Sequence, residues 1–61
     1  MTARAVKILL VEDSATEAAA LAMFLEQEGF AISVARRAER ALELLETSTV
    51  DLVLSDVIMC P

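Results

Sequence analysis

The chain has 61 residues, enough for one small domain that buries only about 60 % of the surface of its unfolded chain, and its 57 % hydrophobic content is too high for a disordered tail. Its net charge of −5, from ten acidic and five basic residues, argues against nucleic-acid contact by this segment. The single cysteine, Cys60, and the absence of histidine exclude an internal disulfide and a zinc site of the usual Cys/His type, so we expect a partner chain to supply stability.

Residues 6–11 form the first predicted strand. Their sequence, VKILLV, is a nearly continuous aliphatic run, which is typical of a strand covered on both faces. The run is far too short to cross a membrane, and Glu12 and Asp13 end it where a signal peptide would still need apolar residues. We therefore expect a cytoplasmic protein without membrane contact.

The first predicted helix follows this strand. Ser14 and Glu17 have the spacing of a capping box, which predicts that the helix begins there, and Gly29 stands where a left-handed C-terminal cap is needed. One apolar stripe on this helix is formed by Ala18, Leu21, Ala22 and Leu25. Met23 and Phe24 lie beside the stripe, and we expect them in the core or in a subunit contact.

The second half of the chain repeats the pattern of strand and helix. Residues 30–35 alternate in side-chain size and predict a short strand, and residues 50–55 predict a third strand that ends at Asp56. Between them, a helical stripe is formed by Ala38, Ala41, Leu42 and Leu45. The arginines at the start of this helix are expected to form a solvated face with nearby glutamates rather than a patch that docks nucleic acid or a partner protein. These arginines are Arg36, Arg37 and Arg40, and the glutamates are Glu39 and Glu43.

The order strand–helix–strand–helix–strand predicts a parallel, right-handed α/β sheet. With the first strand in the centre, the strand order is 2-1-3 and the two helices lie on opposite faces. This arrangement is half of a doubly wound domain. The exposed edge of the third strand and a bare apolar face of the sheet favour a homodimer, which a domain swap could also produce.

Three carboxylates follow predicted strands: Glu12 and Asp13 follow the first, and Asp56 follows the third. Ligands of open parallel sheets bind outside the carboxyl ends of the strands, where these side chains would converge. Their mutual repulsion is relieved by a cation, and Mg²⁺ accepts one or two carboxylates together with waters and phosphate oxygens. One carboxylate could then act as a nucleophile towards a phosphoryl group. The alternative is that Glu12 and Asp13 are solvated loop charges that lead into a helix N-terminus.

The segments ILLVEDS (residues 8–14), Gly29-Phe30 and DLVLSDVIM (residues 51–59) resemble the receiver domain of two-component response regulators. The resemblance covers essentially the whole chain and about the first half of that domain. It implies a flavodoxin-like fold and a phosphoacceptor role for Asp56. It also implies a Mg²⁺ site made by Glu12, Asp13, Asp56 and the backbone carbonyl of Ile58. The implied phosphoryl donor is a phosphohistidine on a sensor histidine kinase or a histidine phosphotransfer protein, and a chain without histidine fits the acceptor.

The sequence departs from the family in two respects. Cys60 stands between Met59 and Pro61 where receivers usually have Met-Pro, and a redox-sensing role for this thiol is an alternative to a simple family variant. The hydroxyl residue and the lysine that follow the family's later strands would lie beyond Pro61, and Lys7 cannot replace them because it lies inside the first strand. We therefore expect a truncated receiver, residues 1–61, with impaired phosphoryl acceptance.

The alternative function is that of a non-catalytic half-domain that acts as a self-associating assembly unit. Two classes of enzyme are also considered. A dinucleotide-dependent oxidoreductase is disfavoured because residues 12–15 lack the glycines that admit a pyrophosphate. A haloacid-dehalogenase-like phosphatase would need an Asp-x-Asp pair after the first strand, which is absent. We expect a signalling domain rather than an enzyme.

Overall fold

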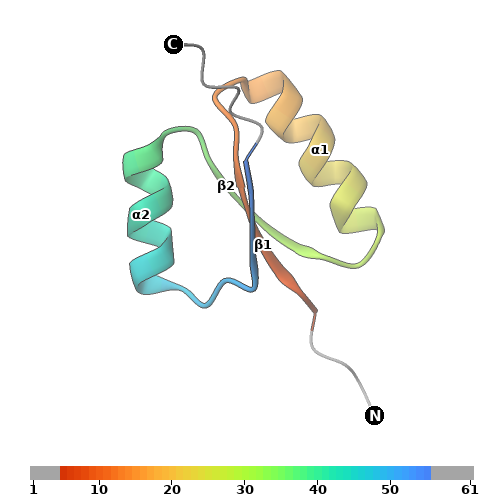
Figure 1. Cartoon of the computed structure of the whole chain (residues 1–61). Coiled ribbons are helices and arrows are strands. Elements are labelled where there is room, and N and C mark those ends of the chain that lie inside the picture. The colour runs from red at the N-terminus through yellow and green to blue at the C-terminus, as the bar shows by residue number, and fades with distance from the viewer. Residues whose placement is uncertain (1–4, 56–61) are drawn as a thin grey trace.

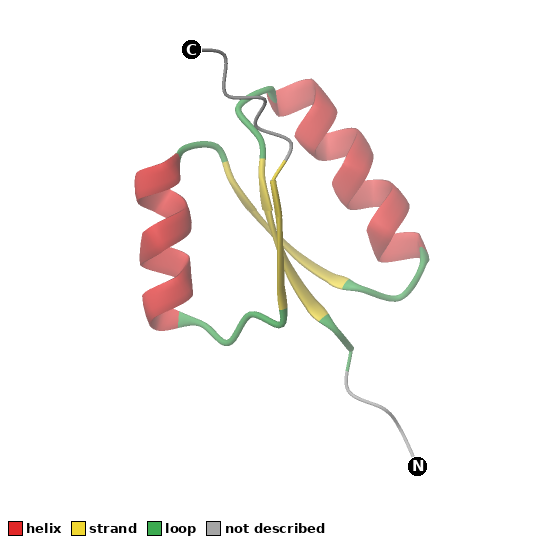
Figure 2. Ribbon diagram, viewed as in Figure 1, coloured by secondary structure: helices red, strands yellow, loops and turns green. Residues whose placement is uncertain are grey.

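The computed structural model describes residues 5–55. Strands β1 (Lys7–Val11), β2 (Ala31–Ala35) and β3 (Leu52–Ser55) form one parallel sheet in the order β2-β1-β3. Helices α1 (Ala15–Gln27) and α2 (Ala38–Thr47) connect the strands and lie on opposite sides of the sheet (Figure 1; Figure 2). The predicted α/β topology is therefore confirmed. Among the described helices, neither is long and apolar enough to cross a membrane.

The three strands end level with one another at the carboxyl edge of the sheet. Val11, the last residue of β1, is in register with Ala35 of β2 and with Ser55 of β3. The residues that follow β1 and β2 therefore leave the sheet at the same edge. This register brings the β1–α1 loop beside the β2–α2 loop.

Helix α1 begins and ends with local hydrogen bonds that its sequence predicts in part. Ser14 is the N-cap, and its hydroxyl accepts the N–H of Glu17. In a capping box the side chain of Glu17 would accept the main-chain N–H of Ser14. Here that N–H donates to the side chain of Glu12 instead. At the other end, Gly29 has a φ of +99°, and the N–H groups of Gly29 and Phe30 donate to carbonyls of the last helical turn, which is a Schellman cap.

The core is centred on β1, whose Leu9 and Leu10 are fully buried. Leu9 packs with Ala35 and with Ala41 of α2, so this side of β1 faces α2. Because side chains alternate along a strand, Ile8 and Leu10 face the opposite side, which α1 covers. The predicted stripe of α1 is confirmed, since Ala18 is buried and Leu21, Ala22 and Leu25 are half-buried.

The predicted apolar stripe of α2 is only partly correct. Ala41 is buried and Leu44 packs against the core, whereas Ala38, Leu42 and Leu45 are exposed, Leu42 by 61 %. Consecutive helical residues are rotated by about 100°, so a helix that packs through Ala41 and Leu44 turns Leu42 and Leu45 away from the sheet. Met23 and Phe24 of α1 are also exposed, so of the two placements expected for them the core is wrong, whereas a subunit contact stays a prediction.

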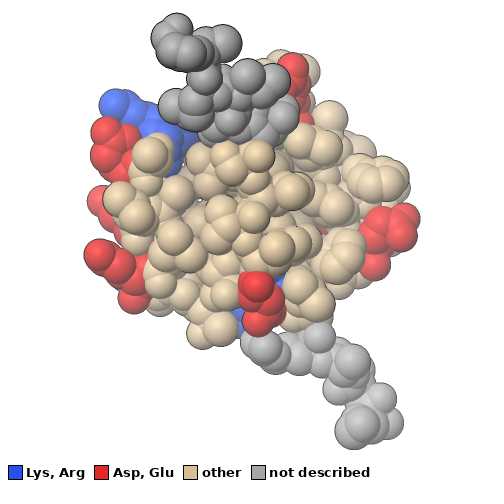
Figure 3. Space-filling view, in the orientation of Figure 1, with Lys and Arg blue, Asp and Glu red and all other residues tan. Residues whose placement is uncertain are grey.

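Strand β3 carries three consecutive exposed apolar side chains. Leu52, Val53 and Leu54 are between 39 % and 50 % exposed, because α1 and α2 contact β1 and β2 but neither contacts β3. Figure 3 shows a broad surface without charged side chains between the two helices, with the charged residues at its rim. Within residues 5–55, β3 is thus paired only on its β1 side.

Candidate functional site

Glu12 is the best-fixed acidic side chain at the carboxyl edge of the sheet. Its main-chain N–H donates to the carbonyl of Ala35 at 2.9 Å, which extends the pairing of β1 and β2 by one residue. The residue is only 5 % exposed, and Oε2 of its side chain accepts the main-chain N–H of Ser14 at 3.0 Å. A carboxylate is buried at a cost unless hydrogen bonds or cations compensate its charge. Glu12 therefore presents carboxylate oxygens in a defined geometry.

Asp13 differs from Glu12 in that its side chain is exposed. Its main-chain carbonyl accepts a hydrogen bond from Nε of Arg36, the residue that directly follows β2, at 3.2 Å. Ser14, next in the chain, caps α1. The segment 12–14 is therefore held from one side by the end of β2 and from the other by the start of α1.

The described residues contain two of the four predicted metal ligands. Glu12 and Asp13 lie at the carboxyl edge as expected, whereas Asp56 and Ile58 lie outside the described residues, as does Cys60. Within residues 5–55, no three Cys, Asp or Glu side chains are close enough together to hold a metal ion. The chemistry of the pair still fits Mg²⁺, which takes hard carboxylate oxygens and keeps several waters, because one carboxylate is fixed and the other faces solvent.

Sequence reasoning missed Arg36 as a residue of this edge. The expected solvated pairs are confirmed for its neighbours, since Arg37 lies 3.8 Å from Glu39 and Arg40 lies 3.0 Å from Glu43, all with exposed side chains. Arg36 instead reaches across to the β1–α1 loop. One sequence signal could have found it: Arg36 directly follows a predicted strand, at the edge that parallel pairing brings beside Asp13.

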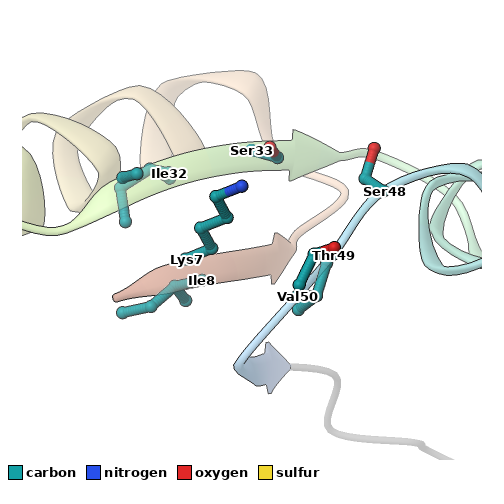
Figure 4. A pocket seen from close by; sticks show the side chains of 8 residues that line it. Lys7, Ile8, Ile32, Ser33, Ser48, Thr49 and Val50 are labelled. Atoms are coloured by element: carbon teal, nitrogen blue, oxygen red, sulfur yellow. The ribbon is translucent and has the colours of Figure 1, made fainter. Parts of the chain in front are cut away.

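A pocket of about 220 Å³ lies at the opposite, amino edge of the sheet (Figure 4). Lys7 lines it together with the hydroxyl residues Ser33, Ser48 and Thr49. The main-chain N–H of Lys7 donates to the carboxylate of Asp51 at 2.9 Å. The expectation that Lys7 lies away from the acidic edge is confirmed, and the pocket has no acidic residue in its lining.

Comparison with known proteins shows similarity to one protein family. The model of the response regulator receiver domain matches residues 8–60. The transcriptional regulatory protein CpxR of Escherichia coli strain K12 is 49 % identical over 53 residues, which are 87 % of this chain and 22 % of that protein. CpxR of Klebsiella pneumoniae subsp. pneumoniae matches with the same identity and coverage, so the chain spans less than a quarter of the length of these relatives. No solved structure gives a significant match. The chain belongs to the family of response regulator receiver domains.

Proposed function

We propose that this chain is the receiver segment of a two-component phosphorelay and that Asp56 accepts a phosphoryl group in a Mg²⁺-dependent step. The donor is a phosphohistidine on a sensor histidine kinase or a histidine phosphotransfer protein. The observation that carries the proposal is the buried carboxylate of Glu12, which lies beside Asp13 at the edge where β1 and β3 both end. Asp56 is the next residue in the chain after Ser55, the last residue of β3.

The proposed chemistry is a transfer between two side chains. A carboxylate oxygen of Asp56 attacks phosphorus and forms a P–O bond while the P–N bond of the phosphohistidine breaks. The electron pair leaves with the imidazole nitrogen, which takes up a proton, and the product is an acyl phosphate. Mg²⁺ would be held by Glu12, Asp13, Asp56 and the backbone carbonyl of Ile58, and when bound it supplies positive charge that offsets the charge of the transferring group.

Glu12, Asp13 and Lys7 contribute differently to the proposed site. Glu12 contributes a carboxylate whose position is fixed by the Ser14 N–H, and Asp13 contributes one that faces solvent. Lys7, the cation within the described strands, lies at the opposite edge of the sheet from Glu12 and Asp13, so we expect it to make no contact with a phosphoryl group at the acidic site. We therefore expect phosphoryl uptake by the 61-residue chain alone to be slow. We further propose that the segment works in the cytoplasm without nucleic-acid contact, which its net charge of −5 supports.

Glu12→Gln tests the role of the acidic pair, with Glu17→Gln as a matched control on the exposed surface of α1. The intact mass of the chain is measured after incubation with Mg²⁺ and a small-molecule phosphoryl donor. We expect Glu12→Gln to lose most of the uptake, since it removes a charged metal ligand, and Glu17→Gln to retain it. Equal uptake by the two variants would contradict the role of Glu12 in the metal site.

A second candidate function is self-association through β3. All four residues of β3 are exposed, and an unpaired edge strand with apolar side chains is a template for pairing with another chain. We propose a second copy of this chain as the partner, paired along β3 in a homodimer. Val53→Lys is expected to give a monomer in sedimentation velocity, whereas Leu42→Lys, on the exposed face of α2, leaves the dimer intact. A monomeric unsubstituted chain at micromolar concentration would contradict this proposal.

A further inference from the structure

One peptide group connects Arg36 to the buried carboxylate of Glu12. The carbonyl of Asp13 accepts a hydrogen bond from Nε of Arg36 at 3.2 Å. The N–H of Ser14 belongs to the same peptide group and donates to Oε2 of Glu12 at 3.0 Å. Because a peptide group is planar, with its C=O and N–H pointing in opposite directions, a bond at one end restrains the direction of the other end. Arg36 and Glu12 therefore hold this peptide between them.

The two bonds also reinforce each other electrically. A side-chain N–H that donates to a carbonyl polarises the peptide, and this makes the N–H at the other end a stronger donor. Oε2 of Glu12 receives that N–H in a site where water has little access, since Glu12 is 5 % exposed. Hydrogen bonds in such a site are stronger than in water. The effect of Arg36 thus reaches the Glu12 carboxylate through this peptide group.

Arg36 is set apart from the two neighbouring arginines by this contact. Arg37 and Arg40 pair with Glu39 and Glu43 on the exposed surface of α2, where ion pairs contribute little. Arg36 spans 23 residues of sequence to reach the β1–α1 loop. Among the described residues, it is the arginine that joins the β2 end of the sheet to the acidic pair.

We propose that Arg36 is a positioning residue for the acidic site: through the Asp13–Ser14 peptide it holds the Glu12 carboxylate in the orientation that binds a divalent cation. This inference rests on the proposed function for the identity of the bound ion. It assigns no contact between Arg36 and the phosphoryl group. Its mechanism is the hydrogen bond donated by Nε, and not the positive charge of the guanidinium.

A pair of substitutions separates the hydrogen bond from the charge. In Arg36→Gln, the side-chain nitrogen stands the same number of bonds from the main chain as Nε of arginine, so the donor is kept and the charge is lost. In Arg36→Met, a methyl group takes that place, so donor and charge are both lost. The loss of charge is common to the two variants, and its effect cancels when they are compared. Arg37→Gln and Arg37→Met are the matched controls, because Arg37 pairs with Glu39 on the exposed surface.

Two measurements are made by NMR on the full chain. Amide hydrogen exchange of Ser14 in the absence of metal reports the bond to Glu12, and titration with MgCl₂ reports the affinity of the acidic site. We expect Ser14 to exchange about two- to tenfold faster in Arg36→Met than in Arg36→Gln, the range that one hydrogen bond of this kind produces. The Mg²⁺ affinity is expected to be lower in Arg36→Met by a similar factor. The two Arg37 variants should not differ.

The outcomes distinguish this inference from the proposed function. Equal exchange rates in Arg36→Met and Arg36→Gln overturn the positioning role, and so does tighter Mg²⁺ binding by the same factor in both variants, which is the result of removing a charge alone. Faster exchange in Arg36→Met supports the role even if the unsubstituted chain binds no Mg²⁺. A failure of the unsubstituted chain to bind Mg²⁺ would instead contradict the metal site of the proposed function.

Discussion

Two of the three leucines of helix α2 differ in burial, and their replacement tests the packing of the fold. Leu44 packs against the core cluster of Leu9, Ala35 and Ala41, whereas Leu42 is 61 % exposed. Leu44→Ala and Leu42→Ala make the same chemical change in the same helix. Any effect of helix propensity is therefore common to the two variants.

The expected difference follows from the apolar surface that each leucine removes from water. Replacing a buried leucine by alanine costs about 2–5 kcal/mol, and the partly buried Leu44 falls near the lower end, at about 2 kcal/mol. Leu42→Ala should change the free energy of unfolding by less than about 0.5 kcal/mol, as for other surface positions. A domain of this length has a total stability of roughly 3–9 kcal/mol, so the loss at Leu44 is a large share of it.

Urea denaturation followed by far-ultraviolet circular dichroism measures both variants, at one protein concentration because self-association would shift the midpoint. With a slope near 1 kcal/mol per molar urea, Leu44→Ala should lower the midpoint by about 2 M and Leu42→Ala by less than about 0.5 M. A larger loss for Leu42→Ala would refute the packing described here. It would mean that the stripe through Leu42 and Leu45 faces the sheet, as sequence periodicity alone predicts.

Three further substitutions test local features by the same assay. Ser14→Ala removes the N-cap of α1 and should cost about 1 kcal/mol, whereas Ser14→Asn should cost little; equal losses would argue against capping. Gly29→Ala should cost about 1–2 kcal/mol, because φ is +99° while the added methyl has open space, and an unchanged stability would contradict this backbone conformation. Arg40→Gln should change stability by less than about 0.5 kcal/mol, since its pair with Glu43 is exposed, and a larger loss would reveal a further contact.

The topology could be predicted because each element carries its own local signal. The aliphatic run of β1, the Ser14 cap and Gly29 all act within a few residues, and the alternation of strands and helices leaves few ways to connect a parallel sheet. The 2-1-3 order then places the residues after β1 and after β2 at one edge. Glu12 and Asp13 are neighbours in the chain, so their meeting at this edge needed no long-range information.

The buried face of α2 could not be predicted in the same way. Ala41 belongs both to the stripe with Leu42 and Leu45 and to the face with Leu44, and both satisfy helical spacing. The choice depends on where the sheet lies, and β3 has no helix over it among the described residues. The contact of Arg36 with Asp13 is similar, because it spans 23 residues and depends on how the two loops meet.

Native mass spectrometry of Asp56→Asn and Asp51→Asn tests the central claim, phosphoryl acceptance by Asp56, most directly. In the sequence, Asp51 precedes the third strand and Asp56 follows it. Asp51→Asn is therefore the matched control, since it makes the same chemical change at the other end of the strand. During prolonged incubation with Mg²⁺ and a small-molecule phosphoryl donor, we predict slow uptake of one phosphoryl group by the unsubstituted chain and by Asp51→Asn. We predict none on Asp56→Asn or without Mg²⁺. A stable oligomer with no uptake in any sample would contradict the phosphoacceptor function and favour the assembly unit.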